Sequence, residues 1–310
     1  MEIRQLKLFV AVAEELHFGR AASRLHMAQP PLSQQIRLIE EQLGVKLFLR
    51  TTRSVELTSA GEALLKHART VISAMEEAEL AAKASGSGMF GRVRIGFAGA
   101  ATRHLLPLLA REVKTRYPNI ELQLQGNLYA NAAQEAVARG EIDLGFVRLP
   151  FNLPGLAYRA IEEETLVCVV STANELAARP YVAIADLADQ PFVTFPRDAG
   201  STLRAITNKV CWDAGFNPRV VQEAPDSYTI HAMVAAGQGV SIAFSSTSNI
   251  NQPGVTYLPI RGDLPRLQSA IAWSAESKST AVLAVVEVAE DIFPKPPTSI
   301  STSDKLPIDH

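Results

Sequence analysis

Cysteine is scarce in this chain of 310 residues, which has only Cys168 and Cys211. Two cysteines cannot form a disulfide framework, and neither stands in a CxxC or CxxH pair that would indicate a metal or redox centre. Both lie among apolar residues, so we expect buried free thiols in a reducing compartment. The chain has no apolar run of about 18 residues that would span a bilayer and no N-terminal signal segment. These absences predict a cytoplasmic protein without a membrane partner.

Groups that would support catalysis or cofactor binding are equally sparse. Neither a GxGxxG motif nor a phosphate-binding loop occurs, and no constellation of nucleophile and general base emerges. The histidines lack the spacing of metal ligands and stand at His17, His26, His67, His104, His231 and His310. We therefore expect no enzyme activity, no metal and no cofactor.

Charge is nearly balanced over the whole chain, with 30 Lys and Arg against 32 Asp and Glu. A DNA-binding protein without sequence preference would usually be far more basic. A local imbalance exists all the same, because Lys46, Arg50 and Arg53 face no acidic residue between positions 44 and 55. The hydrophobic fraction of 47% is typical of a globular protein, and the length indicates two or three domains.

Three zones of the sequence differ in pattern. Residues 1–58 have the periodicity of short helices followed by a strand-like stretch, and residues 59–84 have that of one long helix. Residues 92–293 alternate strand-like and helix-like segments, which is typical of an α/β fold with largely parallel sheets. Ser85–Gly88 has the composition of a flexible joint, and residues 294–310 have that of a disordered tail.

The first zone predicts three helices, which cover Ile3–Leu16, Phe18–Leu25 and a stretch from Gln29 to about Leu43. Gly44 is placed to cap the third helix. In that helix a buried stripe recurs at steps of four and three residues and consists of Leu32, Ile36, Ile39 and Leu43.

The opposite face of the third helix is polar and carries Pro30, Gln34 and Arg37, with Ser33 at its flank. Such groups can reach phosphates or base edges, since Gln pairs with adenine and Arg with guanine. An isolated helix of this kind would indicate no more than a solvated face on a three-helix domain. A short helix, a tight turn and a second helix together favour a helix-turn-helix over about residues 18–37.

A basic stretch follows the third helix. Residues 45–50 and 55–58 have the pattern of two strands joined by a polar turn, which predicts a wing. Arg50 and Arg53 are placed to touch the DNA backbone or to enter the flanking minor groove. The first zone therefore predicts double-stranded DNA as a partner.

The runs of residues 21–36, 38–50 and 57–61 resemble the signature of LysR-type transcriptional regulators, beginning with AASRLHMAQPPLSQQI at Ala21. The match is dense over residues 1–65 and implies a winged helix-turn-helix over residues 1–58. It places Gln29, Pro30, Ser33 and Gln34 at the DNA and Arg53 in the wing. With the residues assigned from the faces above, the predicted DNA-binding set is Gln29, Pro30, Pro31, Ser33, Gln34, Arg37, Arg50 and Arg53. Position 34 is often arginine in the family, so Gln34 departs from the pattern.

The long helix is expected to begin at a capping box formed by Ser59 and Glu62. Its apolar seam recurs in heptads and consists of Leu64, Ala68, Val71, Met75, Ala78 and Ala82. We expect this seam to pair with a second copy of the chain, the alternative being that it packs on its own domain. Residues 59–88 would then form the linker, the dimerisation helix and the hinge. The resemblance also favours a dimer, and commonly a dimer of dimers, whose paired modules read a pseudo-palindromic site.

The third zone is similar, more loosely, to the two-subdomain, periplasmic-binding-protein-like sensor of LysR-type regulators. The matching landmarks are EIDLGF from Glu141 and VAAGQGV from Val234. The resemblance implies an effector-binding regulatory domain with its effector in the cleft between two subdomains. The implied boundaries are 89–293 for the domain, about 92–165 and 268–293 for subdomain I, and about 166–267 for subdomain II.

The pocket positions that this match implies are Gly99, Ala100, Thr102, Arg148, Ser201, Thr202, Asp226 and Ser227. Arg148 could pair with a ligand carboxylate or sulfonate, or form an ion pair between the subdomains. Ser201 and Thr202 could contact the ligand or cap a helix. Gly99 and Ala100 stand where the family often has hydroxyl side chains, and Phe244 stands where many relatives have proline.

We therefore expect a sequence-specific, DNA-binding transcriptional regulator under the control of a small-molecule effector. The effector is predicted to be an organic acid, with aromatic acids among the candidates. A regulator that responds to a non-anionic ligand, or to none, is the alternative. An activator of this kind would also contact RNA polymerase. A solute-binding protein would share the α/β part of the chain but would have no use for residues 1–58.

Overall fold

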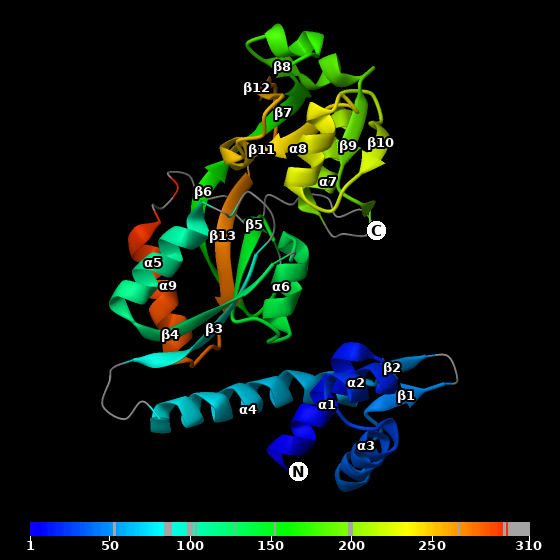
Figure 1. Ribbon diagram of the computed structural model, residues 1–310, viewed down its shortest axis with the longest axis vertical. Helices are drawn as coiled ribbons and strands as arrows, with labels where there is room; N and C mark the ends of the chain where they lie inside the picture. Colours follow the sequence, from blue (N-terminus) through cyan, green and yellow to red (C-terminus); the bar gives the residue numbers. More distant parts are fainter. Residues whose placement is uncertain are drawn as a thin grey trace. The chain divides into compact units, whose positions relative to one another are not determined.

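The computed structural model (Figure 1) describes residues 1–51, 54–83, 89–97, 102, 104–126, 128–151, 153–197, 201–265, 267–293 and 296. The chain divides into two compact units, which are Met1–Gly91 with Arg139–Glu141, and Arg92–Ala138 with Ile142–His310. The predicted joint at Ser85–Gly88 lies outside the described residues, as does the predicted tail apart from Pro296. Among the described residues, no helix combines the length and the apolar character needed to cross a membrane.

The N-terminal unit contains three short helices, a two-stranded hairpin and a long helix (Figure 1). These elements are α1 (Ile3–Glu15), α2 (Phe18–Arg24), α3 (Gln29–Leu43), β1 (Phe48–Arg50), β2 (Val55–Leu57) and α4 (Ser59–Lys83). β1 and β2 are antiparallel, with Phe48 opposite Leu57 and Arg50 opposite Val55. The winged helix-turn-helix expected from the sequence is confirmed.

The buried side of α3 differs from the predicted stripe at its C-terminal end. Leu32, Ile36 and Ile39 are fully buried, but Leu43 is 41% exposed. α3 ends at Gly44, whose φ of 69° places it in the left-handed region that favours glycine. Leu43 stands in the last turn, beyond the reach of the core, whereas Glu40 is only 3% exposed. The apolar periodicity therefore predicted the burial of Leu43 wrongly, and it did not predict that Glu40 is buried.

The start of α4 also differs from the predicted capping box. Thr58, and not Ser59, provides the cap, because the Thr58 Oγ1 atom accepts the N–H of Gly61 at 3.0 Å. The same hydroxyl donates to the carbonyl oxygen of Lys46 at 2.7 Å, and the N–H of Thr58 donates to the carbonyl of Leu47 at 3.0 Å. A Cβ atom at Gly61 would clash with that carbonyl. The cap thus joins α4 to the chain segment that precedes β1.

The apolar seam of α4 has two parts. Ala68 is buried in the core of the N-terminal unit and Leu64 packs against that core, so the first part covers its own domain. Val71 and Met75 are 44% and 43% exposed, and Ala78 is exposed as well. The side chain of Ala82 lies outside the described residues. The expected continuous seam is therefore wrong for its first turns, where α4 packs against α1.

The C-terminal unit contains a five-stranded sheet in the order β4-β3-β5-β13-β6. α5 and α9 lie together on one face of this sheet, and α6 covers the other (Figure 1). The elements are β3 (Phe90–Gly96), α5 (Leu105–Arg116), β4 (Asn119–Gln125), α6 (Ala130–Ala138), β5 (Leu144–Leu149), β6 (Leu156–Glu164), β13 (Leu267–Ser274) and α9 (Thr280–Ile292). Apolar residues on both faces of the sheet form two buried clusters.

A second, four-stranded sheet has the order β11-β7-β12-β8, and β9 pairs with β10 beside it. The strands are β7 (Leu166–Ser171), β8 (Val182–Ala183), β9 (Pro191–Thr194), β10 (Arg219–Glu223), β11 (Ser241–Phe244) and β12 (Val255–Arg261). The helices are α7 (Thr202–Asp213), α8 (Ser227–Ala235) and the short 3-10 helices η1 (Glu175–Ala178), η2 (Ile184–Leu187) and η4 (Ser245–Asn249). One further core cluster is formed mainly by these elements and also includes Leu267 of β13.

The prediction of largely parallel sheets is wrong. β13 runs antiparallel to both β5 and β6, and β7 runs antiparallel to both β11 and β12. The chain passes from the first sheet to the second between β6 and β7 and returns between β12 and β13 (Figure 1). Because β13 enters the five-stranded sheet on this return, it runs opposite to β5, while β3 and β5 remain parallel.

Candidate DNA-binding and effector sites

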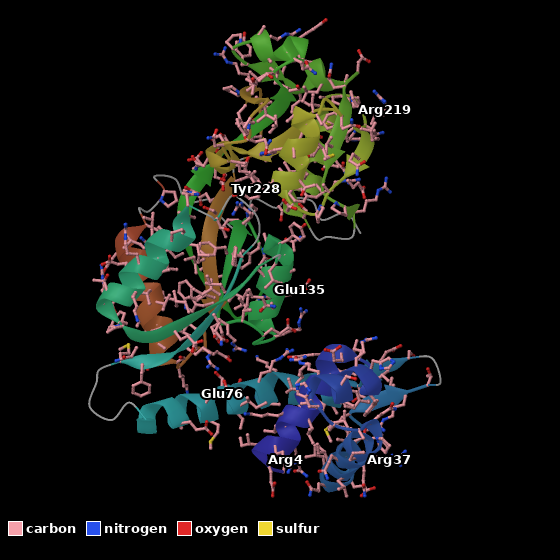
Figure 2. The ribbon with its side chains drawn as sticks, viewed as in Figure 1. Arg4, Arg37, Glu76, Glu135, Arg219 and Tyr228 are labelled. Carbon is pink, nitrogen blue, oxygen red and sulfur yellow. The ribbon has the colours of Figure 1, made fainter. Side chains whose placement is uncertain are left out.

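The polar face of α3 is open to solvent. Gln29, Pro30, Pro31, Gln34 and Arg37 are exposed, and Figure 2 labels Arg37 on this helix. Both prolines lie in the first turn, where the missing N–H groups remove no intrahelical hydrogen bond. The side chains of α3 predicted to bind DNA therefore lie on one exposed face of the helix, near its N-terminus. Ser33 is half-buried at the flank of the same face.

The start of α2 lies close to the start of α3. The Nδ1 atom of His17 caps α2 by accepting the N–H groups of Gly19 and Arg20 at 3.1 and 3.2 Å. A Cβ atom at Gly19 would lie 3.0 Å from the His17 ring and 3.6 Å from the Oε1 atom of Gln29. Glycine at this position thus leaves room for the His17 ring that caps α2, whereas the contact with Gln29 would be an ordinary one.

Arg50 lies against its own domain. Its guanidinium stands 4.5 Å from the centre of the Phe18 ring, and its Nη2 atom is 3.5 Å from the Oε2 atom of Glu40. Burial lowers the pKa of Arg50, the charge of Glu40 opposes this shift, and the charge of Arg37 adds to it. The prediction that Arg50 touches DNA stays untested, and Arg53, its partner in that prediction, lies outside the described residues.

Glu40 is a residue that the sequence reasoning missed. Its Oε1 atom accepts the N–H groups of Leu47 and Phe48 at 3.0 and 3.2 Å, and its Oε2 atom is 3.2 Å from the Nζ atom of Lys46. Burial alone would raise the pKa of this carboxyl, but the two N–H groups, with Lys46 and Arg50, lower it below its ordinary value. Its spacing of four residues from Ile36 is the sequence signal that would have indicated a place on the buried side.

The effector positions at the start of the C-terminal unit are only partly described. Gly99 and Ala100 lie outside the described residues. Thr102 is buried, and its carbonyl oxygen accepts the N–H groups of Leu105 and Leu106 at 3.1 Å each. Thr102 therefore stands directly before α5, at the end where the first N–H groups of that helix point.

Arg148, in β5, is buried and already has a carboxylate partner. Its Nη2 atom lies 3.0 Å from the Oε1 atom of Glu164 at the end of β6, and its guanidinium stands 4.7 Å from the centre of the Phe244 ring. Burial raises the pKa of Glu164 above its ordinary value, although Arg148 opposes this shift. Ser246 of η4 donates its hydroxyl to Glu164 at 3.0 Å. Arg148 and Glu164 belong to the same five-stranded sheet, so the observed ion pair lies within that sheet and is not the pair between subdomains that was considered as an alternative.

The positions at the starts of α7 and α8 act as helix caps. Ser201 caps α7 by accepting the N–H of Arg204, and Asp226 caps α8 by accepting the N–H and the hydroxyl of Thr229 at 3.0 and 2.8 Å. Ser227 is buried at the first position of α8, and Figure 2 labels Tyr228 beside it. The capping alternative considered for Ser201 is therefore realised.

Residues that precede or begin α6 meet these two helix starts. The hydroxyl of Thr202 donates to the Oδ1 atom of Asn131 at 3.2 Å. The hydroxyl of Tyr129 donates to the carbonyl oxygen of Pro225, and its ring stands edge-on to Phe195 at 5.5 Å. Burial raises the pKa of Tyr129, and the charge of Asp226 adds to this shift. No local pattern in the sequence pointed to Tyr129 or Asn131, because the partners of both residues lie more than 60 positions away.

The two cysteines are buried and free, as predicted. Burial raises the pKa of both thiols to about 12, so both remain protonated at neutral pH. Within the described part of the chain, no three His, Cys, Asp or Glu residues are grouped so that they could hold a metal ion.

Known proteins resemble this chain along most of its length. Residues 3–62 match the family described as bacterial regulatory helix-turn-helix protein, lysR family, and residues 86–293 match the LysR substrate binding domain. The HTH-type transcriptional regulator ShiR of Corynebacterium glutamicum is 43% identical over 293 residues, which are 94% of this chain and 99% of that protein. AlsR of Bacillus subtilis is 38% identical, over 83% of this chain and 85% of that regulator.

A solved structure of full-length CbnR complexed with its target DNA is similar as well. It is 28% identical in sequence, covers 94% of this chain and 99% of that protein, and has a TM-score of 0.66. The winged helix-turn-helix and the two-sheet α/β unit together define a DNA-binding regulator with a separate effector-binding domain. The chain belongs to the LysR family of transcriptional regulators.

Proposed function

We propose that this regulator responds to a small organic acid, aromatic acids included, bound between the two sheets of the C-terminal unit. The contact of the Thr202 hydroxyl with Asn131 carries this proposal, because it brings the start of α7 against the start of α6. Tyr129 brings the start of α8 to the same region through Pro225. The first N–H groups of a helix have no intrahelical acceptor and favour an anion, so the start of α7, whose cap Ser201 is uncharged, suits a carboxylate. The start of α8 already has the carboxylate of Asp226.

The proposed effector set remains the one expected from the sequence, namely Gly99, Ala100, Thr102, Arg148, Ser201, Thr202, Asp226 and Ser227. Within this set, Arg148 already pairs with Glu164, since its Nη2 atom lies 3.0 Å from that carboxylate. A ligand carboxylate would share the guanidinium with Glu164 or replace Glu164 there. The domain boundaries of residues 1–58, 59–88 and 89–293 are part of the same proposal.

The proposed DNA interface is the exposed face of α3 with the wing. The regulator would act on DNA in the cytoplasm as a dimer or a dimer of dimers, and would contact RNA polymerase where it activates a promoter. No catalytic role is proposed. The exposed Val71 and Met75 of α4 support pairing with a second copy, because two large apolar side chains one turn apart favour a partner helix.

Thermal unfolding in the presence of benzoate and of its uncharged counterpart benzamide tests the effector class. An organic-acid sensor is stabilised by carboxylates of this kind and not by the amides, because binding to the folded state raises Tm. A panel of small acids and their amides, measured on the wild type and on Arg148→Ala, extends the test. Stabilisation by the amides, or by no member of the panel, would favour the alternative of a non-anionic ligand or none. Equal stabilisation of both proteins by an acid would count against a role for Arg148.

A further inference from the structure

The carboxylate of Glu40 joins the exposed helix α3 to the wing. Four donors surround it: the N–H groups of Leu47 and Phe48, the ammonium of Lys46 and the guanidinium of Arg50. The two N–H groups belong to the segment that leads into and begins β1. Glu40 is 3% exposed, so this carboxylate has been moved out of water and is compensated by these donors.

Arg50 extends this cluster to α2. Its guanidinium stands over the ring of Phe18, the first residue of α2, and Phe18 in turn stands edge-on to Phe48 at 5.9 Å. A guanidinium over an aromatic face, paired with a buried carboxylate, is held in one orientation from two sides. The side chain of Arg50 is 27% exposed, whereas that of Lys46 is 73% exposed.

We propose that Glu40 is a positioning residue for DNA binding, which rests on the DNA-binding function of the chain. It holds β1 and Arg50 against α3 and α2, and so fixes the place of the wing relative to the exposed face of α3. The affinity for DNA then depends on a buried carboxylate that does not touch the DNA. Arg50 contributes through Glu40 and Phe18, and not through a phosphate.

Two adjacent glutamates of α3 provide a matched test of this role. Removing a negative charge from a DNA-binding surface ordinarily strengthens binding, because phosphates are repelled less. Glu41→Gln removes such a charge at an exposed position next to Glu40. Glu40→Gln removes the same charge and weakens the hold on Lys46 and Arg50. We expect Glu40→Gln to bind DNA about tenfold more weakly than the wild type, which is the effect of losing one hydrogen bond to a charged group. Glu41→Gln should bind DNA equally well or more tightly.

These affinities are measured by fluorescence anisotropy with the full-length protein and labelled DNA from the region beside its own gene. The temperature is chosen so that circular dichroism shows each variant to be folded. The double variant Glu40→Gln with Arg50→Gln should bind no more weakly than the weaker single variant, because the two residues act as one unit. Glu40→Gln binding as tightly as Glu41→Gln, or the two single effects adding in the double variant, would overturn the inference.

The salt dependence of binding separates positioning from phosphate contact. Each phosphate contact contributes about 0.9 to the slope of log affinity against log salt. Arg50→Gln should weaken binding and leave this slope unchanged, whereas a slope lower by about 0.9 per module would make Arg50 a phosphate contact and overturn the inference. This arm also decides the matter if Glu40→Gln does not fold. If the wild type itself prefers this DNA no more than competitor DNA, the proposed operator binding fails, a result distinct from these.

Discussion

Replacing Glu164 with glutamine should destabilise the C-terminal unit strongly. The substitution leaves the buried guanidinium of Arg148 without the carboxylate that lies 3.0 Å away, while its contact with the Phe244 ring remains. Removing one partner of a buried ion pair costs about 3–5 kcal/mol, because the other charge stays out of water without compensation. In a domain of this size each kcal/mol lowers Tm by about 2–4 °C. The expected loss is therefore about 6–20 °C.

Tryptophan fluorescence reports this transition selectively. The sequence has two tryptophans, Trp212 and Trp273, and both lie in the C-terminal unit. Glu163→Gln is the matched control, because Glu163 precedes Glu164 on β6 and is exposed. Equal Tm values for the two variants would refute the reasoning. The double variant Arg148→Met with Glu164→Leu should recover much of the lost stability, since an apolar pair of similar volume removes the uncompensated charge.

Two further predictions concern α4 and His231. The double substitution Val71→Asp with Met75→Asp should abolish both dimerisation and operator binding. Analytical ultracentrifugation and anisotropy measure the two effects, with Thr70→Asp and Ala74→Asp as the control variant. Full operator binding by a monomeric variant would contradict this prediction. Burial lowers the pKa of His231 from 6.5 to about 4, so between these values the unfolded chain takes up a proton that the folded chain refuses. The free energy of unfolding should fall by about 3 kcal/mol as the pH drops from about 6.5 to about 4. Urea unfolding of the wild type and of His231→Gln measures this change. The same pH dependence in both proteins would be evidence against the prediction.

Local signals predicted much of the N-terminal unit. The bounds of α1, α2 and α3 follow from apolar periodicity and from Gly44, because helix ends depend on residues close in sequence. The same signals failed where distant backbone groups decide. Glu40 is buried because it receives N–H groups seven and eight residues away, and Thr58 caps α4 because its hydroxyl also meets Lys46.

Sheet direction and the effector region were less accessible to sequence reasoning. The alternation of strands and helices predicted an α/β unit, but it carried no sign that β13 returns antiparallel from the second sheet. The pairing of Arg148 with Glu164 and that of Thr202 with Asn131 join residues 16 and 71 positions apart. The first pairing depends on β5 and β6 lying on either side of β13 in one sheet, and the second on how elements of the two sheets pack. Local periodicity in a single sequence specifies neither.

The DNA preference of the full-length protein tests the central claim most directly. Anisotropy titrations at 50 and 200 mM salt would compare DNA from the region beside its own gene with a shuffled duplex of the same length. A sequence-specific regulator should bind the first duplex about 1,000-fold or more tightly than the second at the higher salt. Equal affinities, both falling together as salt rises, would mean that the exposed face of α3 meets only the phosphate backbone, and would contradict the account.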